Sequence, residues 1–250
     1  VIAGLPAARV ALEEYDPTIE WRPLVSDGEM VAAGTTVAEV SGKARSLLAV
    51  ERPLLNLLGH LSGIATLTRQ FVEAVAGTAA RIYDTRKTMP GWRRLEKYSV
   101  RAGGGHNHRL GLFDGILIKD NHLALAATAQ GMPPTPAEAV RTARRFLEQL
   151  AEDDPHRGLL VEVEVDSLEQ LGEVLPARPD IVLLDNMPPE TLCRAVDLRN
   201  RLAAEVELEA SGGISLPTVG AVARSGVERI SVGALTHSAE WLDVGLDWII

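Results

Sequence analysis

The chain has 250 residues, 46% of them hydrophobic, and a formal net charge of −9. This length fits one large domain, or a large domain with a small one, and it can bury a sizeable core. The acidic balance argues against a binding surface for long nucleic acid, which is usually basic. No apolar run approaches the roughly 18 residues that favour a membrane span.

Cys193 is the only cysteine, which excludes an internal disulfide and a cysteine-based zinc cage. A single thiol fits a reducing cytoplasm. The first residues lack a basic region followed by a long apolar core, so we expect no signal peptide and a cytoplasmic location. The chain begins without Met and in the middle of an expected element, so we expect residues upstream to be missing.

Residues 1–50 predict a small β-rich unit. A helix is expected at Ala7–Tyr15 and a strand at Ile19–Leu24. The valines and the Asp-Gly and Ala-Gly turns of residues 25–42 then predict further short strands. The pattern V-x-D-G-x-x-V-x-x-G is similar to half of a biotin or lipoyl carrier, but no hairpin lysine follows it, which argues against that role.

Leucines and other apolar residues at helical spacing predict one long helix over Glu51–Ala76. Pro53 suits the first turn of this helix. Gly59 and Gly63 lower its helix propensity and therefore indicate close packing. His60, on the same helix, is expected to be a core or interface residue rather than a ligand.

From residue 79 onward, short apolar strands alternate with helices, which predicts a parallel sheet with right-handed crossovers. A proline-rich loop over residues 131–139 leads into one of the helices. The apolar end, residues 241–250, is expected to form a strand or helix that packs back onto the amino-terminal unit. The expected strands are Ala80–Asp84, Gly115–Lys119, Leu159–Val165, Asp180–Leu184, Val206–Ala210 and Arg229–Val232, and the expected helices lie near residues 91–102, 136–152, 167–175, 188–203 and 215–225.

Polar residues lie at the carboxyl end of every one of these strands. In a parallel α/β barrel, the carboxyl ends of the strands form the edge that carries the active site. Six such coincidences are harder to dismiss than any single one. They comprise Asp84 to Lys87, Lys119 to Asn121, Glu164 and Asp166, Asp185 and Asn186, Ser211 to Gly213, and Gly233.

The strand VEVEVD carries acids where a barrel strand should be apolar on both faces. Period-two geometry places Glu162, Glu164 and Asp166 on one face and the valines on the other. Burying an unpaired carboxylate costs several kcal/mol, so these acids must meet cations, a metal or ligand hydroxyls. Internal ion pairs with Lys119 or Arg109 are the structural alternative to a functional role.

A basic stretch runs from Thr85 to Asp120, with eight Lys or Arg residues against three acids. In an acidic protein, such a local patch is expected to capture an anion of limited size. Arg86 and Arg109 offer forked donors for carboxylates, and Lys87 offers a point charge for a phosphate. The alternative is a solvated basic face.

Two loops of small residues follow the last two strands, beginning at Ser211-Gly212-Gly213 and Gly233-Ala234. Small residues let a phosphate approach backbone N–H groups, and in barrels this often happens after the last two strands. Ordinary tight turns are the alternative. There is no Walker A or Rossmann glycine pattern, no His pair with metal spacing and no nucleophile elbow.

From Glu51 onward the chain resembles the quinolinate phosphoribosyltransferase family, also called nicotinate-nucleotide pyrophosphorylase (carboxylating). The resemblance is weak before Glu51, where that family usually has a further segment. The matching segments, in order, are ERPLLNLLGHLSGIATLT, DTRKTMPGWRRLEKYSVRAGGGHNHRLGLFDGILIKDNH, VEVEVDSLEQL, LLDNM, EASGGI and ISVGALTHS.

The resemblance implies a seven-stranded parallel α/β barrel, of the type II phosphoribosyltransferase kind, with a smaller amino-terminal α+β sandwich. The implied domains are residues 1–54, joined by the tail 238–250, and residues 55–237. It also implies a homodimer with shared active sites, with a trimer of dimers as the alternative, and no nucleic acid or membrane as a partner.

The resemblance implies phosphoribosyl transfer from 5-phosphoribosyl 1-pyrophosphate (PRPP) to quinolinate with loss of CO2, as a step of NAD synthesis. Mg²⁺ is the implied cofactor, held by Glu164 and Asp185, with coordination through water as the alternative. The implied quinolinate residues are Arg86, His108, Arg109 and Lys119, with Arg52 from the partner subunit. The implied PRPP residues are Lys87, Glu164, Asp185, Ser211, Gly212, Gly233, Ala234 and His237, of which Lys87, Glu164 and Asp185 are also the implied catalytic residues.

Three other functions remain open. A relative with the same fold could act on another acidic heterocycle, as in the molybdenum-operon homologues. A non-catalytic sensor of a phosphate ligand would not need Lys87, Glu164 and Asp185 together. A Schiff-base aldolase could use Lys119 if a neighbouring cationic cluster lowered the pKa of that lysine.

Overall fold

The structure is a computed structural model that describes residues 1–126 and 131–248. The chain forms two compact units. The first contains residues Val1–Glu73 and Lys87–Asn107 and the chain from Gly233 onward, and the second contains Ala74–Arg86 and His108–Val232. The domain division expected from the sequence, after residues 54 and 237, stays a prediction. No helix among the described residues is both long enough and apolar enough to cross a bilayer.

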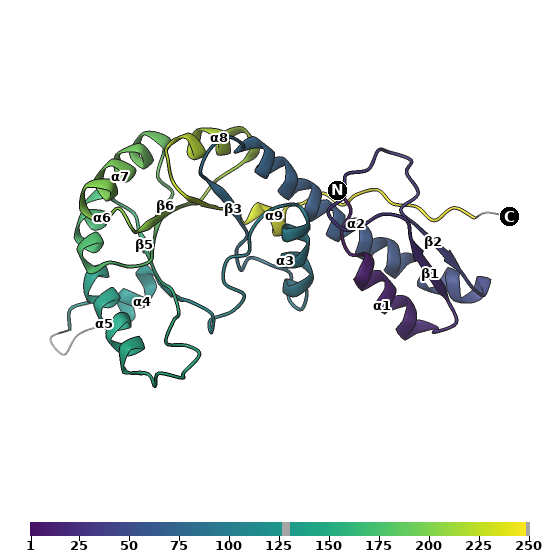
Figure 1. Ribbon diagram of the computed structural model, residues 1–250, viewed down its shortest axis with the longest axis horizontal. Helices are drawn as coiled ribbons and strands as arrows, with labels where there is room; N and C mark the ends of the chain where they lie inside the picture. The colour runs from purple at the N-terminus through teal and green to yellow at the C-terminus, as the bar shows by residue number, and fades with distance from the viewer. Residues whose placement is uncertain (127–130, 249–250) are drawn as a thin grey trace. The chain divides into compact units, whose positions relative to one another are not determined.

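The first unit combines four helices with an antiparallel pair of strands (Figure 1). Asp27, in a loop distant in sequence, caps the amino terminus of the first helix. Its two carboxylate oxygens accept backbone N–H groups, from Gly4 at 2.8 Å and from Leu5 at 3.1 Å. A buried apolar cluster from α1 and α2 holds the unit together. Its elements are α1 (Leu5–Tyr15), β1 (Glu20–Pro23), β2 (Ala38–Ser41), α2 (Ala44–Ala74), α3 (Arg93–Ala102) and α9 (Ala234–His237).

Three expectations for this unit are wrong in detail. The long helix begins at Ala44 rather than Glu51, so Pro53 lies inside it and not in its first turn. The apolar face that buries Leu47 and Val50 in the core outweighs the roughly 3 kcal/mol that an internal proline costs. Residues 25–42 form one strand, β2, instead of several, and residues 239–248 form neither strand nor helix.

The end of the chain nevertheless packs back onto the first unit, as expected. The Leu242 backbone N–H donates to the Gly59 carbonyl oxygen at 2.9 Å, and the Leu242 side chain packs against the α1–α2 core. A Cβ at Gly59 would lie 2.8 Å from the Leu242 carbonyl oxygen, and one at Gly63 would overlap the carbonyl oxygen of Glu240. The close packing that the two glycines indicated is therefore confirmed.

We expect Gly63→Ala to lower the free energy of unfolding by at least about 1 kcal/mol. Overpacking costs about 1–3 kcal/mol, and the overlap with a backbone oxygen places Gly63→Ala at the upper end of that range, so the gain of about 1 kcal/mol in helix propensity offsets only part of the cost. Urea unfolding of both proteins measures the difference. Gly245→Ala is the matched control, because a Cβ there meets no described atom within 4 Å. Equal stability of the Gly63→Ala variant and the wild type would show that the tail does not dock here.

The second unit is a six-stranded parallel sheet in the order β3-β8-β7-β6-β5-β4. Helices α5 to α8 lie along the outer side of the curved sheet (Figure 1). The strands are β3 (Arg81–Tyr83), β4 (Ile116–Ile118), β5 (Val161–Val165), β6 (Ile181–Asp185), β7 (Glu207–Ser211) and β8 (Arg229–Ser231). The helices are α4 (Asp120–Leu125), α5 (Pro136–Gln149), α6 (Leu168–Val174) with the 3-10 turn η1 (Leu175–Ala177), α7 (Pro189–Leu202) and α8 (Leu216–Arg224).

All six strands expected from the sequence form, and the parallel α/β sheet is confirmed. The five helices expected between them also form, and the proline-rich loop ends where Thr135 caps α5. Helix α4 was not expected. The seventh strand and the closure of the barrel stay predictions. A hydrogen bond connects the segment before β4 to the end of β3. The His108 backbone N–H donates to the Asp84 carboxylate at 2.8 Å.

Candidate active site

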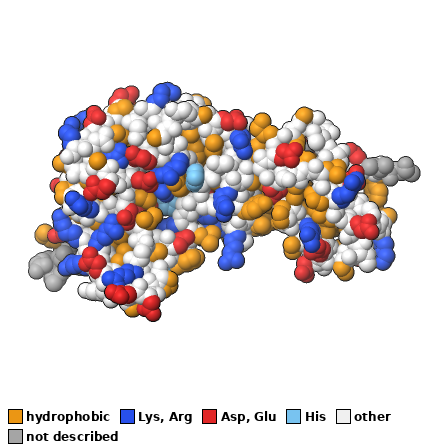
Figure 2. All heavy atoms as spheres, viewed as in Figure 1, with side chains coloured by type: hydrophobic (Ala, Val, Ile, Leu, Met, Phe, Trp, Pro, Cys, Tyr) orange, Lys and Arg blue, Asp and Glu red, His pale blue; other side chains and the backbone are white. Residues whose placement is uncertain are grey.

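The carboxyl ends of the parallel strands bring the expected polar residues of the second unit to one edge of the sheet. Lys119 follows β4, Glu164 lies near the end of β5, and Asp185 ends β6 opposite Ser211 of β7. Over the second unit, at the left of Figure 2, Lys and Arg side chains are interspersed with Asp and Glu. That face therefore carries charges of both signs.

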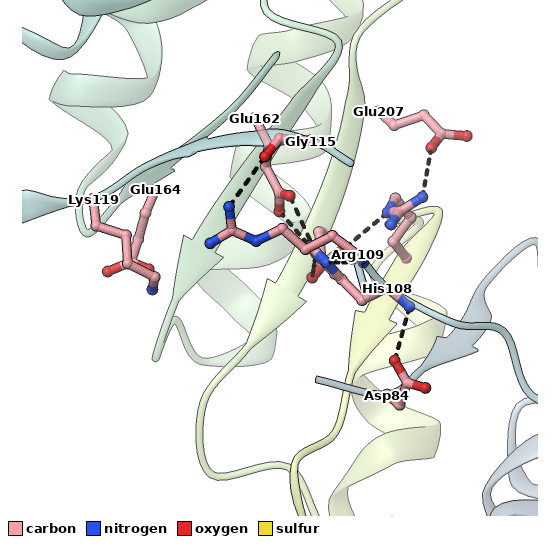
Figure 3. Close-up of polar contacts among 10 residues, drawn as sticks. Asp84, His108, Arg109, Gly115, Lys119, Glu162, Glu164 and Glu207 are labelled. Atoms are coloured by element: carbon pink, nitrogen blue, oxygen red, sulfur yellow. Dashed lines mark hydrogen bonds and ion pairs between the residues drawn. The ribbon is translucent and has the colours of Figure 1, made fainter. Parts of the chain in front are cut away.

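Lys119 and Glu164 form an ion pair at this edge (Figure 3). The Lys119 side chain is 38% exposed and that of Glu164 is 16% exposed, so water reaches the pair. The expectation that Glu164 must meet a cation is confirmed. The structural alternative, an internal ion pair, predicts the same contact, so the contact alone assigns no role to either residue.

A second and more deeply buried group surrounds His108 (Figure 3). Its Nε2 atom lies 3.1 Å from a Glu162 carboxylate oxygen and 3.4 Å from Oε1 of Glu209. The other Glu209 oxygen accepts a hydrogen bond from Nε of Arg229 at 2.7 Å. Arg229 in turn lies over the Tyr83 ring, with its guanidinium carbon 3.8 Å from the ring centre. Strands β3, β5, β7 and β8 all contribute to this group.

The charges in this group shift one another's pKa values. Burial opposes a charge on the His108 ring, but Glu162 and Glu209 outweigh it and raise the pKa of His108 to about 9. Burial and the nearby Glu209 carboxylate raise the pKa of Glu162. Burial would also raise that of Glu209, but His108 and Arg229 outweigh burial and hold the pKa of Glu209 below its usual range.

The Arg109 amide lies against the other nitrogen of the His108 ring, with its N–H donating to Nδ1 at 2.8 Å. This contact favours the neutral ring with its proton on Nε2, whereas the two carboxylates favour the doubly protonated ring. One neutral hydrogen bond is worth about 1 kcal/mol, and the rise in the pKa of His108 to about 9 is worth about 3. The carboxylates therefore outweigh this contact and favour the cationic ring at neutral pH.

This raised pKa gives a pH-dependent contribution to stability. In the unfolded chain the pKa of His108 returns to about 6.5. The stabilisation is therefore complete below about pH 6.5 and is lost as the pH rises through about 9. We expect the difference in unfolding free energy between wild type and His108→Gln to shrink by about 3 kcal/mol between pH 6 and pH 9.5. Urea unfolding of both proteins at the two pH values tests this, and a constant difference would contradict a cationic His108.

Arg109 lies within the electrostatic reach of another cation, Arg86. Its guanidinium donates to the Gly115 carbonyl oxygen at 3.1 Å. Burial and then the nearby Arg86 lower the pKa of Arg109, and Glu162 and Asp114 offset this only in part. An anion bound near both guanidinium groups would offset the repulsion that Arg86 exerts on Arg109. This part of the edge can therefore bind a carboxylate or a phosphate.

Two of the expected phosphate-binding residues lie together at the end of β7. The Asn186 backbone N–H donates to the Ser211 carbonyl oxygen at 2.8 Å, and its side-chain amide donates to Asp185 at 2.7 Å. Gly212 follows with a φ of 94°, and a Cβ there would overlap the Asn186 side chain. Only glycine fits this left-handed position without displacing Asn186. Ser211 and Gly212 thus bring backbone close to Asp185.

A comparable arrangement lies in the first unit. A Cβ at Gly233 would lie 3.0 Å from Cδ of Lys87 and 3.2 Å from Nε2 of His237. The Thr236 hydroxyl donates to the Lys87 carbonyl oxygen at 2.7 Å. Lys87, Gly233 and His237 are therefore neighbours, and Ala234 begins the short helix α9 beside them. A basic side chain, an imidazole and a bare backbone suit a phosphate group.

Most of the expected site residues thus lie beside other expected site residues of the same unit. Within the described part of the chain, Arg52 forms no hydrogen bond or ion pair with any of them. Arg52 is exposed on α2, in the first unit. Sequence reasoning missed Asp84 as an anchor and missed Glu209 and Arg229 altogether. Glu209 had a signal, because Val206 to Ala210 reads VELEA and repeats the alternation of valines and acids in β5. Arg229 had none, because its partner lies on another strand.

A curved parallel sheet whose carboxyl edge gathers cations and carboxylates is typical of enzymes that bind anionic substrates there. Comparisons with known protein families and solved structures show which family of such enzymes the chain belongs to. The family model described as "Quinolinate phosphoribosyl transferase, C-terminal domain" matches residues 64–247, and the corresponding N-terminal domain model matches residues 1–62. The chain belongs to the quinolinate phosphoribosyl transferase family.

Named relatives agree with this assignment. The chain is 46% identical over 249 residues to the nicotinate-nucleotide pyrophosphorylase [carboxylating] of Mycobacterium leprae, covering 99% of this chain and 82% of that protein. It is 40% identical over 247 residues to a probable enzyme of the same name from Bacillus subtilis, covering 99% and 79%. The crystal structure of NadC from Streptococcus pyogenes superposes with a TM-score of 0.84 at 38% identity, covering 97% of this chain and 80% of that one.

Proposed function

We propose that this enzyme transfers the phosphoribosyl group of PRPP to quinolinate. The products are nicotinate mononucleotide, pyrophosphate and CO2, and the reaction is a step of de novo NAD synthesis. The observation that carries this proposal is the match to the quinolinate phosphoribosyl transferase family, and the electrostatic effect of Arg86 on Arg109 agrees with it, because quinolinate presents two adjacent carboxylates on one ring. An arginine fork matches a carboxylate in shape and charge.

The acid-binding set consists of residues that the resemblance implied. In it, Arg86 and Arg109 take the two carboxylates, with Lys119 and His108 adding positive charge. The Lys119–Glu164 ion pair opens when the substrate competes for the ammonium group, and this releases the Glu164 carboxylate toward the ribose. Binding the acid thus prepares the group that the sugar needs.

The donor sugar develops positive charge at C1 as its bond to pyrophosphate breaks. The carboxylates of Glu164 and Asp185 stabilise that charge and accept hydrogen bonds from the ribose hydroxyls. Lys87 takes a phosphate of the donor, and Ser211, Gly212, Gly233, Ala234 and His237 take its 5′-phosphate. The pyridine nitrogen then forms the new bond to C1 as the bond from C1 to pyrophosphate breaks. The 2-carboxylate leaves as CO2, and the electron pair of the broken C–C bond stays on C2 of the ring, which takes up a proton from water. The protein orients the reactants and stabilises charge, and it needs no covalent nucleophile.

The chain's residues fit the implied Mg²⁺. Asp185 and Glu164 lie on neighbouring strands and both are partly exposed, which suits an ion that keeps most of its waters. The only three-residue group among residues 1–126 and 131–248 that could hold an ion is a different one, His108, Glu162 and Glu209. Its carboxylates already meet His108 and Arg229. Bound Mg²⁺ would neutralise the charge of the leaving pyrophosphate.

We extend the proposal to the finer architecture. The curved sheet is part of a seven-stranded barrel, and the first unit corresponds to the α+β sandwich. The enzyme is a homodimer, or a trimer of dimers, in which Arg52 of each subunit completes the site of its partner. Its exposure on α2 leaves Arg52 available for this role. A cytoplasmic location stays a prediction.

Subunit mixing tests the shared site. We expect Arg52→Ala and Arg109→Ala homo-oligomers to be weakly active, and a mixture of them to regain about a quarter of the wild-type activity. Statistical exchange makes half of all dimers hybrids, and each hybrid has one intact site. Exchange is verified with two affinity tags on the subunits. No gain in activity despite verified exchange would contradict a shared site.

The reaction itself is tested by supplying PRPP and Mg²⁺ with either quinolinate or nicotinate, and by measuring CO2 and the mononucleotide. We expect both products from quinolinate and none from nicotinate. Product from nicotinate alone would show that the substrate is nicotinate and not quinolinate. No product from either acid would favour the alternative of a non-catalytic sensor of a phosphate ligand. The aldolase is disfavoured already, because an ion-paired Lys119 is a poor nucleophile.

A further inference from the structure

Glu209 is a buried carboxylate to which neither the resemblance nor the proposed reaction gives a role. Its side chain is 0% exposed. One oxygen accepts from Arg229 at 2.7 Å. The other, Oε1, accepts no hydrogen bond from any described residue and lies 3.4 Å from Nε2 of His108. That distance is an ion-pair contact rather than a good hydrogen bond.

The fold alone gives little reason for this arrangement. Leaving a buried charged oxygen without a hydrogen bond costs about 1–3 kcal/mol or more. Arg229 does not need Glu209 as its only counter-ion, because Glu207 on the same strand lies 3.5 Å from it. Glu207 also pairs with Arg81 at 2.6 Å and is partly exposed, so an ion pair with Arg229 costs Glu207 less desolvation than it costs Glu209. Glu209 is therefore the carboxylate of β7 that is set toward His108.

His108 is held from three strands at once. Asp84, at the end of β3, accepts its backbone N–H at 2.8 Å, and Glu162 of β5 and Glu209 of β7 hold its ring. The next residue is Arg109, whose own amide lies against the ring at 2.8 Å. Because Asp84 holds the His108 backbone and the two carboxylates hold Nε2 of its ring, the backbone that carries Arg109 is restrained as well.

We propose that Glu209 is a positioning residue of the acid-binding site, which acts by gripping the His108 ring and so fixes where Arg109 presents its guanidinium group. This inference rests on the proposed function, in which Arg109 binds a substrate carboxylate. Glu209 itself does not touch the substrate. Groups that orient ligand-binding residues in this way typically contribute 10- to 100-fold to affinity in metal sites, and we expect a similar effect here.

The test is Glu209→Gln, which keeps the shape and removes the charge. We expect the KM for quinolinate to rise about 10- to 100-fold while the KM for PRPP stays within about twofold. Glu207→Gln is the matched control, because it also removes a carboxylate from Arg229 but does not touch His108. Both constants are expected to stay within about twofold of wild type in Glu207→Gln. A residue needed only for folding would lower the active fraction, and hence kcat, without changing either KM.

A double-mutant cycle shows whether Glu209 acts through His108. We expect Glu209→Gln to raise the quinolinate KM much less in a His108→Gln background than in wild type. Additive effects would overturn the route through His108. If Glu209→Gln does not fold, Glu209→Asp keeps the charge for Arg229 and shortens the reach to His108, and a quinolinate-specific rise in KM is again expected. Failure of both variants to fold would overturn the inference, because Glu209 would then be a structural residue.

The outcomes also separate this inference from the proposed function. A wild-type enzyme that makes no mononucleotide from quinolinate overturns the proposed function and this inference with it. An active wild-type enzyme with an unchanged quinolinate KM in Glu209→Gln overturns this inference alone.

Discussion

Replacing Arg109 by alanine is expected to raise the quinolinate KM about 30- to 5000-fold and to leave the KM for PRPP within about threefold. Truncating one partner of a hydrogen-bonded charge pair costs about 2–5 kcal/mol. Here the loss is that of one of two neighbouring guanidinium groups, so one substrate carboxylate would be left with too few donors. Steady-state kinetics with each substrate varied in turn measures both constants.

The matched control for this variant is Arg141→Ala. Arg141 is exposed on α5, on the outer side of the sheet, so its loss removes the same charge away from the carboxyl edge. We expect both KM values of this control to match wild type. An unchanged quinolinate KM in Arg109→Ala, or an equal rise in the control, would show that the two guanidinium groups do not clamp the acid.

Glu164→Ala is expected to lower kcat about 100- to 1000-fold. Removing one preorganised electrostatic group from a developing charge costs about 2.7–4 kcal/mol in well-studied sites. The same variant also frees Lys119, whose ammonium group Glu164 holds in the structure. We therefore expect the quinolinate KM to stay level or to fall, because the substrate no longer competes with a carboxylate for Lys119.

Asp166→Ala provides the comparison for Glu164→Ala. Asp166 lies two residues further along the same face of the chain and is exposed. It tests whether any acid at the end of β5 has the same effect, and we expect its kcat to stay within about twofold of wild type. A Glu164→Ala enzyme with normal kcat would leave Glu164 as half of a structural ion pair, the alternative that the contact with Lys119 also allows.

Much of the second unit could be predicted from its sequence. Its strands are short runs of β-branched and aliphatic residues between helices with clear periodicity, and tertiary contacts moved their ends by only one or two residues. The first unit was harder. Helix α2 begins at Ala44 because packing of Leu47 and Val50 overrides the proline inside it. Residues 240–242 lie against the glycines of α2, a long-range contact that no local pattern shows.

The candidate active site also has features that could be predicted from the sequence and features that could not. The pairing of Glu164 with a cation could be predicted, because an acid on a two-sided buried strand has few other choices. The grip of Glu162 and Glu209 on His108 could not, because it depends on which strands lie side by side and how the loop before β4 is anchored. The alternation in VELEA places Glu209 on the inner face, but only the fold shows that it meets His108 and Arg229.

The central claim is that the edge of the sheet recognises two adjacent carboxylates. The most direct measurement compares benzene-1,2-dicarboxylate with benzoate as competitive inhibitors against quinolinate. The first keeps both carboxylates without the reacting nitrogen, and the second keeps one. We predict that the dicarboxylate inhibits at a concentration close to the quinolinate KM, and that benzoate is at least about 30-fold weaker, in line with one lost charge pair. Equal inhibition by the two acids would contradict a two-carboxylate site.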